Sequence, residues 1–328
     1  MNREFSPQRL SRREILRAST LLAGGSALAG VMPQLSLSAT QNVAAPIDPV
    51  EQSRQKMSAI PLQTMPLRDN LHLLYGPGGN MVVLDGPDGK ILVDCSFEKV
   101  APKIKAMMDG FSSAPFKLVI DTHWHFDHTD GNASMHRMGA MILAHENTRK
   151  RLSTPQVIEF LKMHFPPSPP DALPQQTFID SFKLYFNQEE IQLTHVAPAH
   201  TDSDIHVHFV NVNVLHMGDT YFNGQYPFID GSTGGHIDGM IAAAGKGLEL
   251  SDASTKIVPG HGPVGDKAAL TKYRDALVTI RDRVKKQKSA GKTLEETTRT
   301  RPTAEFDAAF SGGLNSPDQF VEFVYRTL

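Results

Sequence analysis

The chain has 328 residues, of which 40% are hydrophobic and 21% are charged, and its formal net charge is −2 at pH 7. This length and composition suit a protein with a sizeable hydrophobic core and exclude a fibrous or intrinsically disordered chain. Charges of both signs are mixed along the sequence without a basic stripe, so we expect no nucleic-acid partner.

The first 39 residues have the pattern of an export signal. Five arginines precede or flank the start of an apolar run at 18–32, which is shorter than the roughly 20 residues of a membrane span. The segment SRREILR at 11–17 resembles the twin-arginine export motif, which implies recognition by the twin-arginine translocase and a periplasmic location without a stable membrane anchor. A basic tail before a membrane-anchoring helix is the alternative interpretation. Residues 1–39 contain five arginines and two glutamates, so their removal would bring the formal charge to about −5.

The next part of the chain is expected to lead into a β-rich core. Residues 40–68 contain Pro and Gln but no clear periodicity, and we interpret them as a linker or N-terminal arm. From residue 69, the runs LHLLYG, NMVVLDG and KILVDC predict three consecutive antiparallel strands. Cys95, the single cysteine, ends the third run and is expected to be a small buried residue. A helix over 98–111, a strand KLVIDT, a helix over 133–138 and a strand MILAH are expected to follow.

A second β-rich half is expected after a proline-rich stretch. HFPPSPPDALP, within 150–174, cannot form regular helix or strand, and we interpret it as an excursion near the mouth of the site. The runs SFKLYFN, EEIQLTHV, DIHVHFV and NVNVLHMGD predict strands, and helices are expected over 236–250, 267–289 and 317–326. Two sets of strands, each followed by helices, predict an α/β fold in which two sheets pack together with helices outside. We expect one domain at 69–265, with 266–328 as C-terminal helices packed on it.

Potential metal ligands follow several of the predicted strands. In KLVIDTHWHFDHTDGN, at 117–132, an apolar strand runs directly into a loop of metal-binding side chains: His123, His125, Asp127 and His128. Further candidates are His200 in APAHTDSD, Asp219 in HMGDTYF and His261 in VPGHGP, with His195 as a weaker one. An isolated histidine would more often be structural, but here the ligand types recur at strand ends.

The order of these motifs resembles that of the metallo-β-lactamase superfamily, over roughly Leu71 to Val264. The resemblance implies an αββα four-layer sandwich with a metal site at one edge of the sheets. Carried over residue by residue, it implies a first metal held by His123, His125 and His200, a second held by Asp127, His128 and His261, and Asp219 as the bridging carboxylate.

The expected chemistry follows from this ligand set. Neutral imidazoles suit Zn²⁺, and two carboxylates offset the charge of two such ions, although iron or manganese would also accept these ligands. A water shared by two metals loses a proton near neutral pH, and the hydroxide is then the expected nucleophile, with Asp127 as a catalytic residue of the site.

Two positions favour some branches of the superfamily over others. The penicillin-degrading branches carry Cys or Ser where this chain has Asp219, which resembles the hydroxyacylglutathione hydrolase, lactonase and ribonuclease branches. His125 stands where the di-iron flavoprotein branch has Glu. We therefore expect an exported binuclear zinc hydrolase that cleaves an ester, thioester, lactone or amide bond. A β-lactam hydrolase, a mononuclear-iron dioxygenase and a metal-bearing accessory protein of an exported pathway are the alternatives.

Residues around these motifs are candidates for contacts with a small-molecule substrate. Aromatic side chains suit the wall of a pocket, and ordinary packing is an equal interpretation of them; those near the motifs are Trp124, Tyr221, Phe222, Tyr226 and Phe228. Of these, Tyr221 and Tyr226 are the predicted substrate contacts, together with His236, which otherwise caps a helix. Asp121 and Asp204 are candidates for orienting a ligand imidazole, and Asp204 serves equally well as a cap. The other histidines, His206 and His216 among them, are expected to be surface or core residues.

Overall fold

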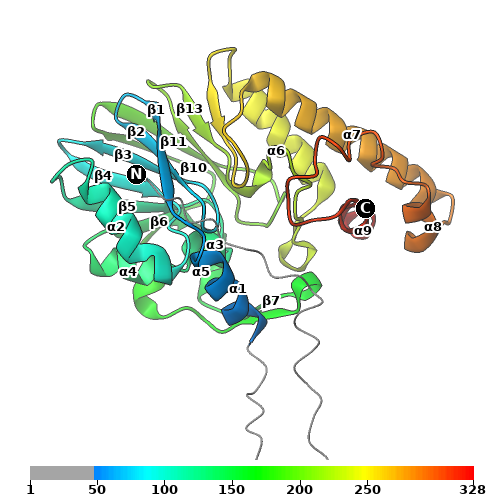
Figure 1. Ribbon diagram of the computed structural model, residues 1–328, viewed down its shortest axis with the longest axis horizontal. Coiled ribbons are helices and arrows are strands. Elements are labelled where there is room, and N and C mark those ends of the chain that lie inside the picture. The colour runs from blue at the N-terminus through cyan, green and yellow to red at the C-terminus, as the bar shows by residue number, and fades with distance from the viewer. Residues whose placement is uncertain (1–47) are drawn as a thin grey trace, which may run out of the picture. The chain divides into compact units, whose positions relative to one another are not determined.

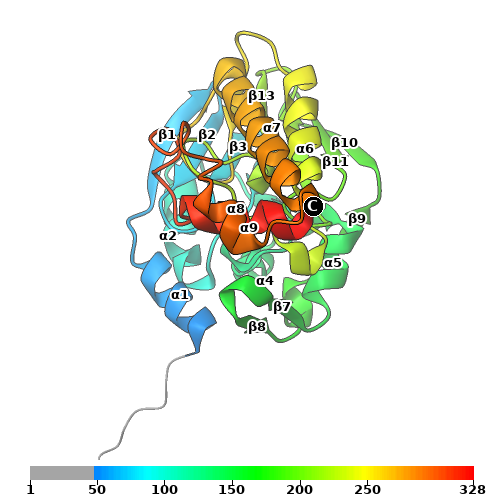
Figure 2. The same ribbon diagram turned by 90° about the vertical axis from the view of Figure 1, so that its right-hand side faces the viewer.

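The computed structural model describes residues 48–328, so the predicted export signal at 1–39 lies outside the described residues. Within them, two β-sheets pack face to face and helices cover their outer faces (Figure 1). Turned by 90°, the structure shows α6, α7, α8 and α9 together on one side of the sheets (Figure 2). None of the helices in 48–328 has the length and apolarity needed to cross a membrane.

The first sheet has seven strands in the order β1-β2-β3-β4-β5-β6-β9. Strands β1 to β4 pair antiparallel along the chain, which confirms the three strands expected from Leu71 onward. Strands β4, β5, β6 and β9 pair in parallel, so connecting segments with helices must cross between them. The bounds are β1 Gln63–Arg68, β2 Leu71–Tyr75, β3 Met81–Gly86, β4 Gly89–Val93, β5 Phe116–Asp121, β6 Met141–His145 and β9 Gln176–Phe178.

The described part of the segment expected as a linker, 48–68, instead holds regular structure. Helix α1 (Pro49–Ser58) begins at Asp48, whose carboxylate accepts a hydrogen bond from the backbone N–H of Val50 at 2.8 Å. Strand β1 lies at the edge of the first sheet, and most of its residues are exposed. The linker interpretation is therefore wrong for these residues. It failed because an exposed helix and an edge strand bury few side chains and leave little apolar periodicity in the sequence.

The second sheet has five strands in the order β10-β11-β12-β13-β14. The first four form an antiparallel meander, and β14 joins β13 in parallel. The four expected strands are confirmed, whereas β14, only three residues long, was missed. The bounds are β10 Ser181–Phe186, β11 Glu189–His195, β12 Ile205–Phe209, β13 Val214–His216 and β14 Lys256–Val258.

Three apolar layers separate the elements. The central layer lies between the sheets and includes Leu84 and Ile120 from the first sheet and Val207 from the second. One outer layer packs α2 against the first sheet, and the other packs α6, α7 and α9 against the second. The predicted αββα four-layer sandwich with extra C-terminal helices is confirmed. The outer helices are α2 Ala101–Asp109, α4 Asn132–Arg137, α6 Ile237–Leu250, α7 Lys267–Ser289, α8 Leu294–Arg299 and α9 Pro317–Thr327.

The proline-rich excursion is largely irregular, as expected, but it begins with a small hairpin. After α5 (Glu146–Leu152), strands β7 (Gln156–Ile158) and β8 (Met163–Phe165) pair antiparallel around the short helix η2 (Glu159–Leu161). The prolines that follow hold the chain extended up to another single turn, η3 (Pro170–Ala172). The hairpin projects from the sandwich beside α1.

Candidate metal centre

All seven predicted ligands lie at one edge of the two sheets. Four come from the loop and the short helix α3 (Phe126–Thr129) that follow β5, and each of the others follows a strand of the second sheet: His200 after β11, Asp219 after β13 and His261 after β14. The ligand atoms form two groups, and within each group all the atoms lie within 4.8 Å of one another. The first group is His123, His125, His200 and Asp219, and the second is Asp127, His128 and His261. This grouping matches the predicted division between two metals.

Asp219 lies between the two groups. One of its oxygens, Oδ1, is 3.2 Å from His128 Nε2, and the other, Oδ2, is 3.4 Å from Nε2 of both His200 and His261. A carboxylate in this place can bind one cation through each oxygen, as expected of the bridging ligand. The short helix η4 (Gly218–Thr220) that carries Asp219 follows β13 directly, so the end of a buried strand sets its position.

Two glycines allow the backbone to approach these ligands closely. A Cβ atom at Gly79 would lie 2.1 Å from Cε1 of His128, and one at Gly260 would lie 1.9 Å from Oδ1 of Asp219. Any other residue at either position would displace a ligand, because these separations are far below van der Waals contact. Neither glycine was among the predicted site residues.

In each buried ligand histidine, one ring nitrogen points toward the other ligands and one points away from them. We call these the inner and the outer nitrogen, and each outer nitrogen has a hydrogen-bond partner. His128 Nδ1 lies 2.7 Å from an Asp94 carboxylate oxygen, and His125 Nε2 lies 3.1 Å from Asp230 Oδ2. His200 donates through Nδ1 to the carbonyl of Phe228 at 2.8 Å, since a carbonyl can only accept. These partners fix the orientation of each ring and assign its proton to the outer nitrogen.

With the proton on the outer nitrogen, the inner nitrogen of a neutral ring carries only a lone pair. His200 Nε2 and His125 Nδ1 are 2.8 Å apart, and with both outer nitrogens protonated, neither neutral ring has a proton to place between them. Buried atoms without a hydrogen-bond partner in 48–328 include His123 Nε2, His128 Nε2 and Asp219 Oδ1. A divalent cation would satisfy all of these atoms, so the donor set fits a nitrogen- and oxygen-binding metal such as Zn²⁺.

The two groups differ in their electrostatics. In the first group, burial lowers the pKa of His123 well below its usual value and that of His200 to about 4. In the second group, burial would also lower the pKa of His261, but Asp219 and Asp127 raise it to about 10. Burial opposes ionisation of Asp127, yet the neighbouring His128 and His261 bring its pKa down to about 2. The carboxylates therefore stay ionised at neutral pH and favour a bound cation.

The residues that orient the ligands differ from those expected. Asp121 accepts a hydrogen bond from the Asn132 amide at 2.8 Å and, within residues 48–328, does not bond a ligand imidazole. Asp204 accepts from the backbone N–H groups of His200 and Thr201, at 2.8 and 2.9 Å, so it holds the loop and not the ring. The cap interpretation of Asp204 is the one that the structure shows.

Asp94 and Asp230 do orient ligand rings, and sequence reasoning missed both. Asp94 directly follows strand β4 in ILVDCS and has a φ of 59°, a left-handed conformation that aspartate tolerates better than most residues. Asp230 begins the turn DGSTGG, where its Oδ1 accepts from the backbone N–H of Ser232 at 3.1 Å. An aspartate at the end of a buried strand and an Asp-Gly turn were the available signals.

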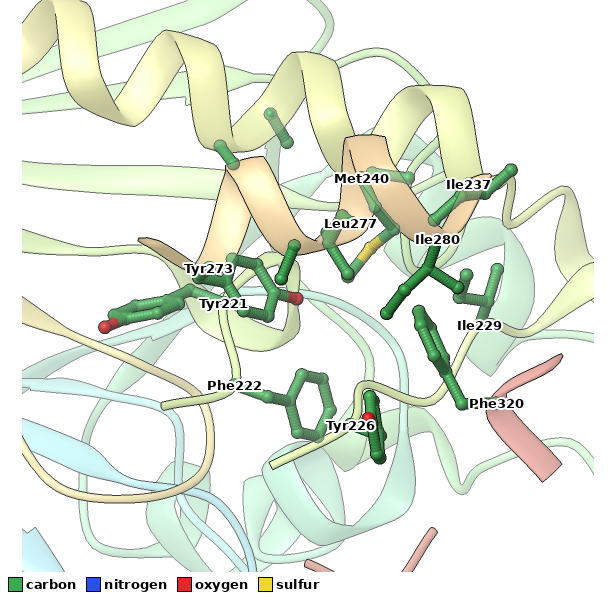
Figure 3. Close-up of a cluster of buried hydrophobic side chains, with 14 of the residues drawn as sticks. Tyr221, Phe222, Tyr226, Ile229, Ile237, Met240, Tyr273, Leu277, Ile280 and Phe320 are labelled. Carbon is green, nitrogen blue, oxygen red and sulfur yellow. The ribbon is translucent and has the colours of Figure 1, made fainter. Parts of the chain in front are cut away.

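The predicted substrate contacts at Tyr221 and Tyr226 are contradicted by the structure. Both side chains are buried in the apolar layer beneath α6, α7 and α9, and the ring of Tyr226 lies beside that of Phe320 (Figure 3). The ring of Tyr226 also stacks on that of Phe310. After Asp219 the chain turns back into the C-terminal helices, so nearness to a ligand in sequence did not place these rings at the site. His236 caps α6 by accepting from the backbone N–H of Asp238 at 3.1 Å and lines neither described cavity.

A cavity of about 1060 Å³ opens at the ligands. Its lining includes His125, Asp127, His200, Asp219 and His261, so both groups reach it. Phe222 and Phe228, which follow Asp219 in the sequence, line this cavity. A separate cavity of about 570 Å³ is lined by Trp124 and by no predicted ligand. The larger cavity is the candidate substrate site, and Trp124 lies outside it.

Comparisons with known proteins agree with this geometry. A family model described as the metallo-beta-lactamase superfamily matches residues 74–284. The fold is similar to that of a metallo-beta-lactamase from Pontibacter korlensis, with 17% sequence identity and a TM-score of 0.55 over 66% of this chain and 99% of the other. It is also similar to the DIM-1 metallo-beta-lactamase, with 19% identity and a TM-score of 0.54 over 67% of this chain and 99% of the other.

A longer stretch of the chain resembles a different solved structure. The sec-alkylsulfatase Pisa1 from Pseudomonas sp. matches 84% of this chain with a TM-score of 0.61 at 14% identity. This chain corresponds to about half of that protein, since the match covers 51% of its length. At these identities the likenesses concern the fold alone.

Proposed function

Since the chain belongs to the metallo-β-lactamase superfamily, we propose that it is an exported hydrolase with two zinc ions that cleaves an ester, thioester, lactone or amide bond. The observation that carries this proposal is the pair of ligand groups around Asp219, with unpaired inner atoms, at the base of a large cavity. Two bound zinc ions would lower the pKa of a shared water to near neutrality and polarise the substrate.

The chain's own residues supply the rest of the chemistry. His123, His125 and His200 would hold one ion, and Asp127, His128 and His261 the other, with Asp219 between them. Asp127 Oδ2 lies 3.3 Å from His261 Nε2 at the cavity wall, and its pKa of about 2 keeps it ionised at neutral pH. As a carboxylate of low pKa it is a weak base, so its role would be to hold the second ion and to keep the attacking water in place.

Metal analysis and a substrate panel test this function. Protein purified without added metal should contain zinc, and zinc-loaded protein should hydrolyse at least one member of a panel of nitrocefin, simple lactones, thioesters, carboxylic esters and a secondary alkyl sulfate. About one iron per chain and no zinc would favour the dioxygenase alternative instead. Hydrolysis of nitrocefin alone would identify a β-lactam hydrolase, and no turnover with full zinc occupancy would favour the accessory-protein alternative.

A variant of Asp127 tests the mechanism. Asp127→Ala should reduce turnover on the best substrate by at least about a hundredfold, because it removes a ligand of the second ion. Its circular dichroism spectrum should match that of the parent protein. Unchanged turnover in a folded Asp127→Ala variant would refute the assigned role. The matched control is Asp171→Ala, since Asp171 is a half-buried carboxylate that pairs with Arg137 away from the larger cavity.

Export through the twin-arginine route is also part of the proposal. Its support is the SRREILR motif and the short apolar run that follows it. Replacing Arg12 and Arg13 by lysine should retain a reporter fused to residues 1–47 in the cytoplasm, whereas the unchanged segment should carry it to the periplasm. Equal periplasmic delivery by both fusions would contradict this route.

A further inference from the structure

The larger cavity has a wall built from parts of the chain that are far apart in sequence. On one side lie Met57 near the end of α1, Ile60 just after that helix, and Met65 of β1. The β7–β8 hairpin contributes Ile158, Phe160, Leu161 and Met163, and the segment before α9 contributes Leu314. We call this wall, together with Phe222 and Phe228, the apolar wall. Apart from Phe222, these residues lie outside the ligand motifs.

Many side chains of the apolar wall are unusually exposed. Leu314 is 85% exposed, Met65 and Leu161 are each 40% exposed, and Ile60 is 37% exposed. Single apolar residues on a surface need no explanation, but four from separate segments around one cavity form a patch of the kind that marks a binding site. Their apolar surface would be removed from water by a ligand that fills the cavity.

The apolar wall reaches the metal ligands themselves. The ring of Phe228 lies 5.8 Å from that of His200, between centroids, and the ring of Phe222 stacks on that of His261 at 5.2 Å. From Phe228 the aromatic contacts continue to Phe160 of the hairpin at 6.3 Å. A substrate whose reactive bond lies at the ligands would therefore have its neighbouring group in contact with aromatic rings and not with water.

Charge on the cavity lining is sparse. Among the described residues that line it, Lys56 is the one lysine or arginine, and the carboxylates are Asp127 and Asp219 at the ligands. A substrate with several negative charges, such as a glutathione thioester or a nucleic acid, would have few partners here. The three methionines of the wall, Met57, Met65 and Met163, add flexible surface that adapts to apolar groups of different shapes.

We propose that the substrate carries a long, uncharged apolar chain next to the bond that is cleaved, and that the apolar wall binds this chain. The proposal rests on the hydrolase function proposed above, because it places the reactive bond at the ligands. It narrows the ester, thioester, lactone and amide classes to members with an aliphatic or aromatic tail, and it assigns specificity to α1, the hairpin and Leu314.

A chain-length series tests this specificity. For zinc-loaded protein and 4-nitrophenyl esters from acetate to decanoate, kcat/KM should rise by about threefold to fourfold per methylene until the cavity is filled, since each buried methylene contributes a similar increment. Octanoate should exceed acetate by at least about a hundredfold. A profile that is flat or falls with chain length, in a protein that hydrolyses acetate, would overturn the tail proposal and leave the hydrolase function standing.

Variants at exposed positions distinguish an effect on substrate binding by the apolar wall from an effect on folding. Leu314→Glu and Leu161→Glu each place a charge on the wall where the side chain is already exposed, so folding should be unaffected. Each should lower the octanoate-to-acetate ratio of kcat/KM by at least about tenfold. The matched control is Ile179→Glu, because Ile179 is 63% exposed and lines neither described cavity. A ratio that is the same in all three variants would contradict the proposal.

A binding measurement decides the proposal even if no ester is hydrolysed. The uncharged fluorophore N-phenyl-1-naphthylamine should bind the full chain and be displaced by 1-decanol at a concentration at least about a hundredfold lower than by 1-butanol. Leu314→Glu and Leu161→Glu should weaken this binding, and Ile179→Glu should not. Binding of this kind, without turnover of any substrate in the panel, would support the apolar site and contradict the hydrolase function. Absence of binding, or binding unaffected by the wall variants, would overturn the apolar site.

Discussion

The buried histidines near Asp219 form two sets, which differ in what their ring nitrogens contact. His206 on β12 and His216 on β13 are 1% and 0% exposed, as buried as the ligand histidines. His216 uses both nitrogens, since Nε2 lies 3.1 Å from the carbonyl of Asn80 and Nδ1 accepts from the backbone N–H of Gly218 at 3.1 Å. His206 bonds the hydroxyl of Thr220 through Nε2 at 2.9 Å.

The buried ligand histidines, His123, His125, His128 and His200, form hydrogen bonds through the nitrogen that points away from Asp219, and they direct the other nitrogen toward Asp219 or toward one another. His206 Nδ1 is also unpaired within 48–328, but the charged groups that shift the pKa of His206 include no carboxylate. Burial of a histidine therefore does not distinguish a metal ligand from a structural residue. Convergence of unpaired nitrogens on a carboxylate does, because only a cation satisfies all of them together.

The strongest test of this comparison changes one residue of each kind and compares the effects on zinc content and on stability. Asp219→Asn should reduce zinc from about two ions per chain to less than one, since it removes the charge shared by both groups, and the circular dichroism spectrum should be retained. His216→Leu should keep its zinc but lose about 1–3 kcal/mol of stability, because it strands the carbonyl of Asn80 and the N–H of Gly218. Metal analysis and urea unfolding measure the two effects. Full zinc occupancy in Asp219→Asn would contradict the bridging role.

A smaller effect is expected at the residue that orients His125. Asp230→Ala should weaken zinc binding by about 10- to 100-fold, because the ring loses the partner that fixes its tautomer and orientation. Asp230→Asn keeps an acceptor oxygen, so its zinc affinity should lie between those of the parent protein and Asp230→Ala. Competition with a chromogenic chelator gives the affinities, and melting of the metal-free proteins shows whether the turn at 230–233 has also been lost. Equal affinities in all three proteins would exclude an orienting role for Asp230.

The burial of His206 predicts how the stability of the protein changes in acid. Burial lowers the pKa of His206 from its usual value of 6.5 to about 3, so between these pH values the unfolded chain binds a proton that the folded chain does not. Stability from this residue is therefore present above pH 6.5 and is lost as the pH falls toward 3. Metal-free His206→Gln should lose less stability than the parent between pH 6.5 and 4.5 in urea unfolding. Parallel curves would show that His206 is protonated alike in both states.

The smallest effects are expected at the two tyrosines that pack behind the ligands. Tyr226→Phe should cost about 0.5–1.5 kcal/mol, because it removes the hydrogen bond from the phenol to Asp307 at 2.9 Å. Tyr221→Phe should be neutral or slightly stabilising, since its hydroxyl is buried without a partner in the described residues. Neither variant should change kcat/KM. A large rise in KM for either one would restore its role as a substrate contact.

The sequence predicted the parts of the fold and site that depend on local pattern. Apolar runs of strand length, bounded by turn residues, located β2 to β6 and β10 to β13, and the order of the histidine and aspartate motifs located all seven residues that the structure brings together. The edge strand β1, helix α1 and the three-residue strand β14 were missed because they are exposed or short and carry little periodicity.

By itself, the sequence determined the two-sheet architecture and the candidate ligand set, because apolar runs mark the buried strands and the candidate ligands follow them. Only the tertiary structure decided which aspartates orient the ligands, which aromatic rings reach the cavity and what kind of wall surrounds it. Asp94 and Asp230 are 34 and 105 residues from the histidines that they hold. Tyr221 and Phe222 are neighbours, yet one is buried in the core and the other lines the cavity. Such choices depend on the direction of each side chain and on contacts between distant segments, which one-dimensional patterns do not contain.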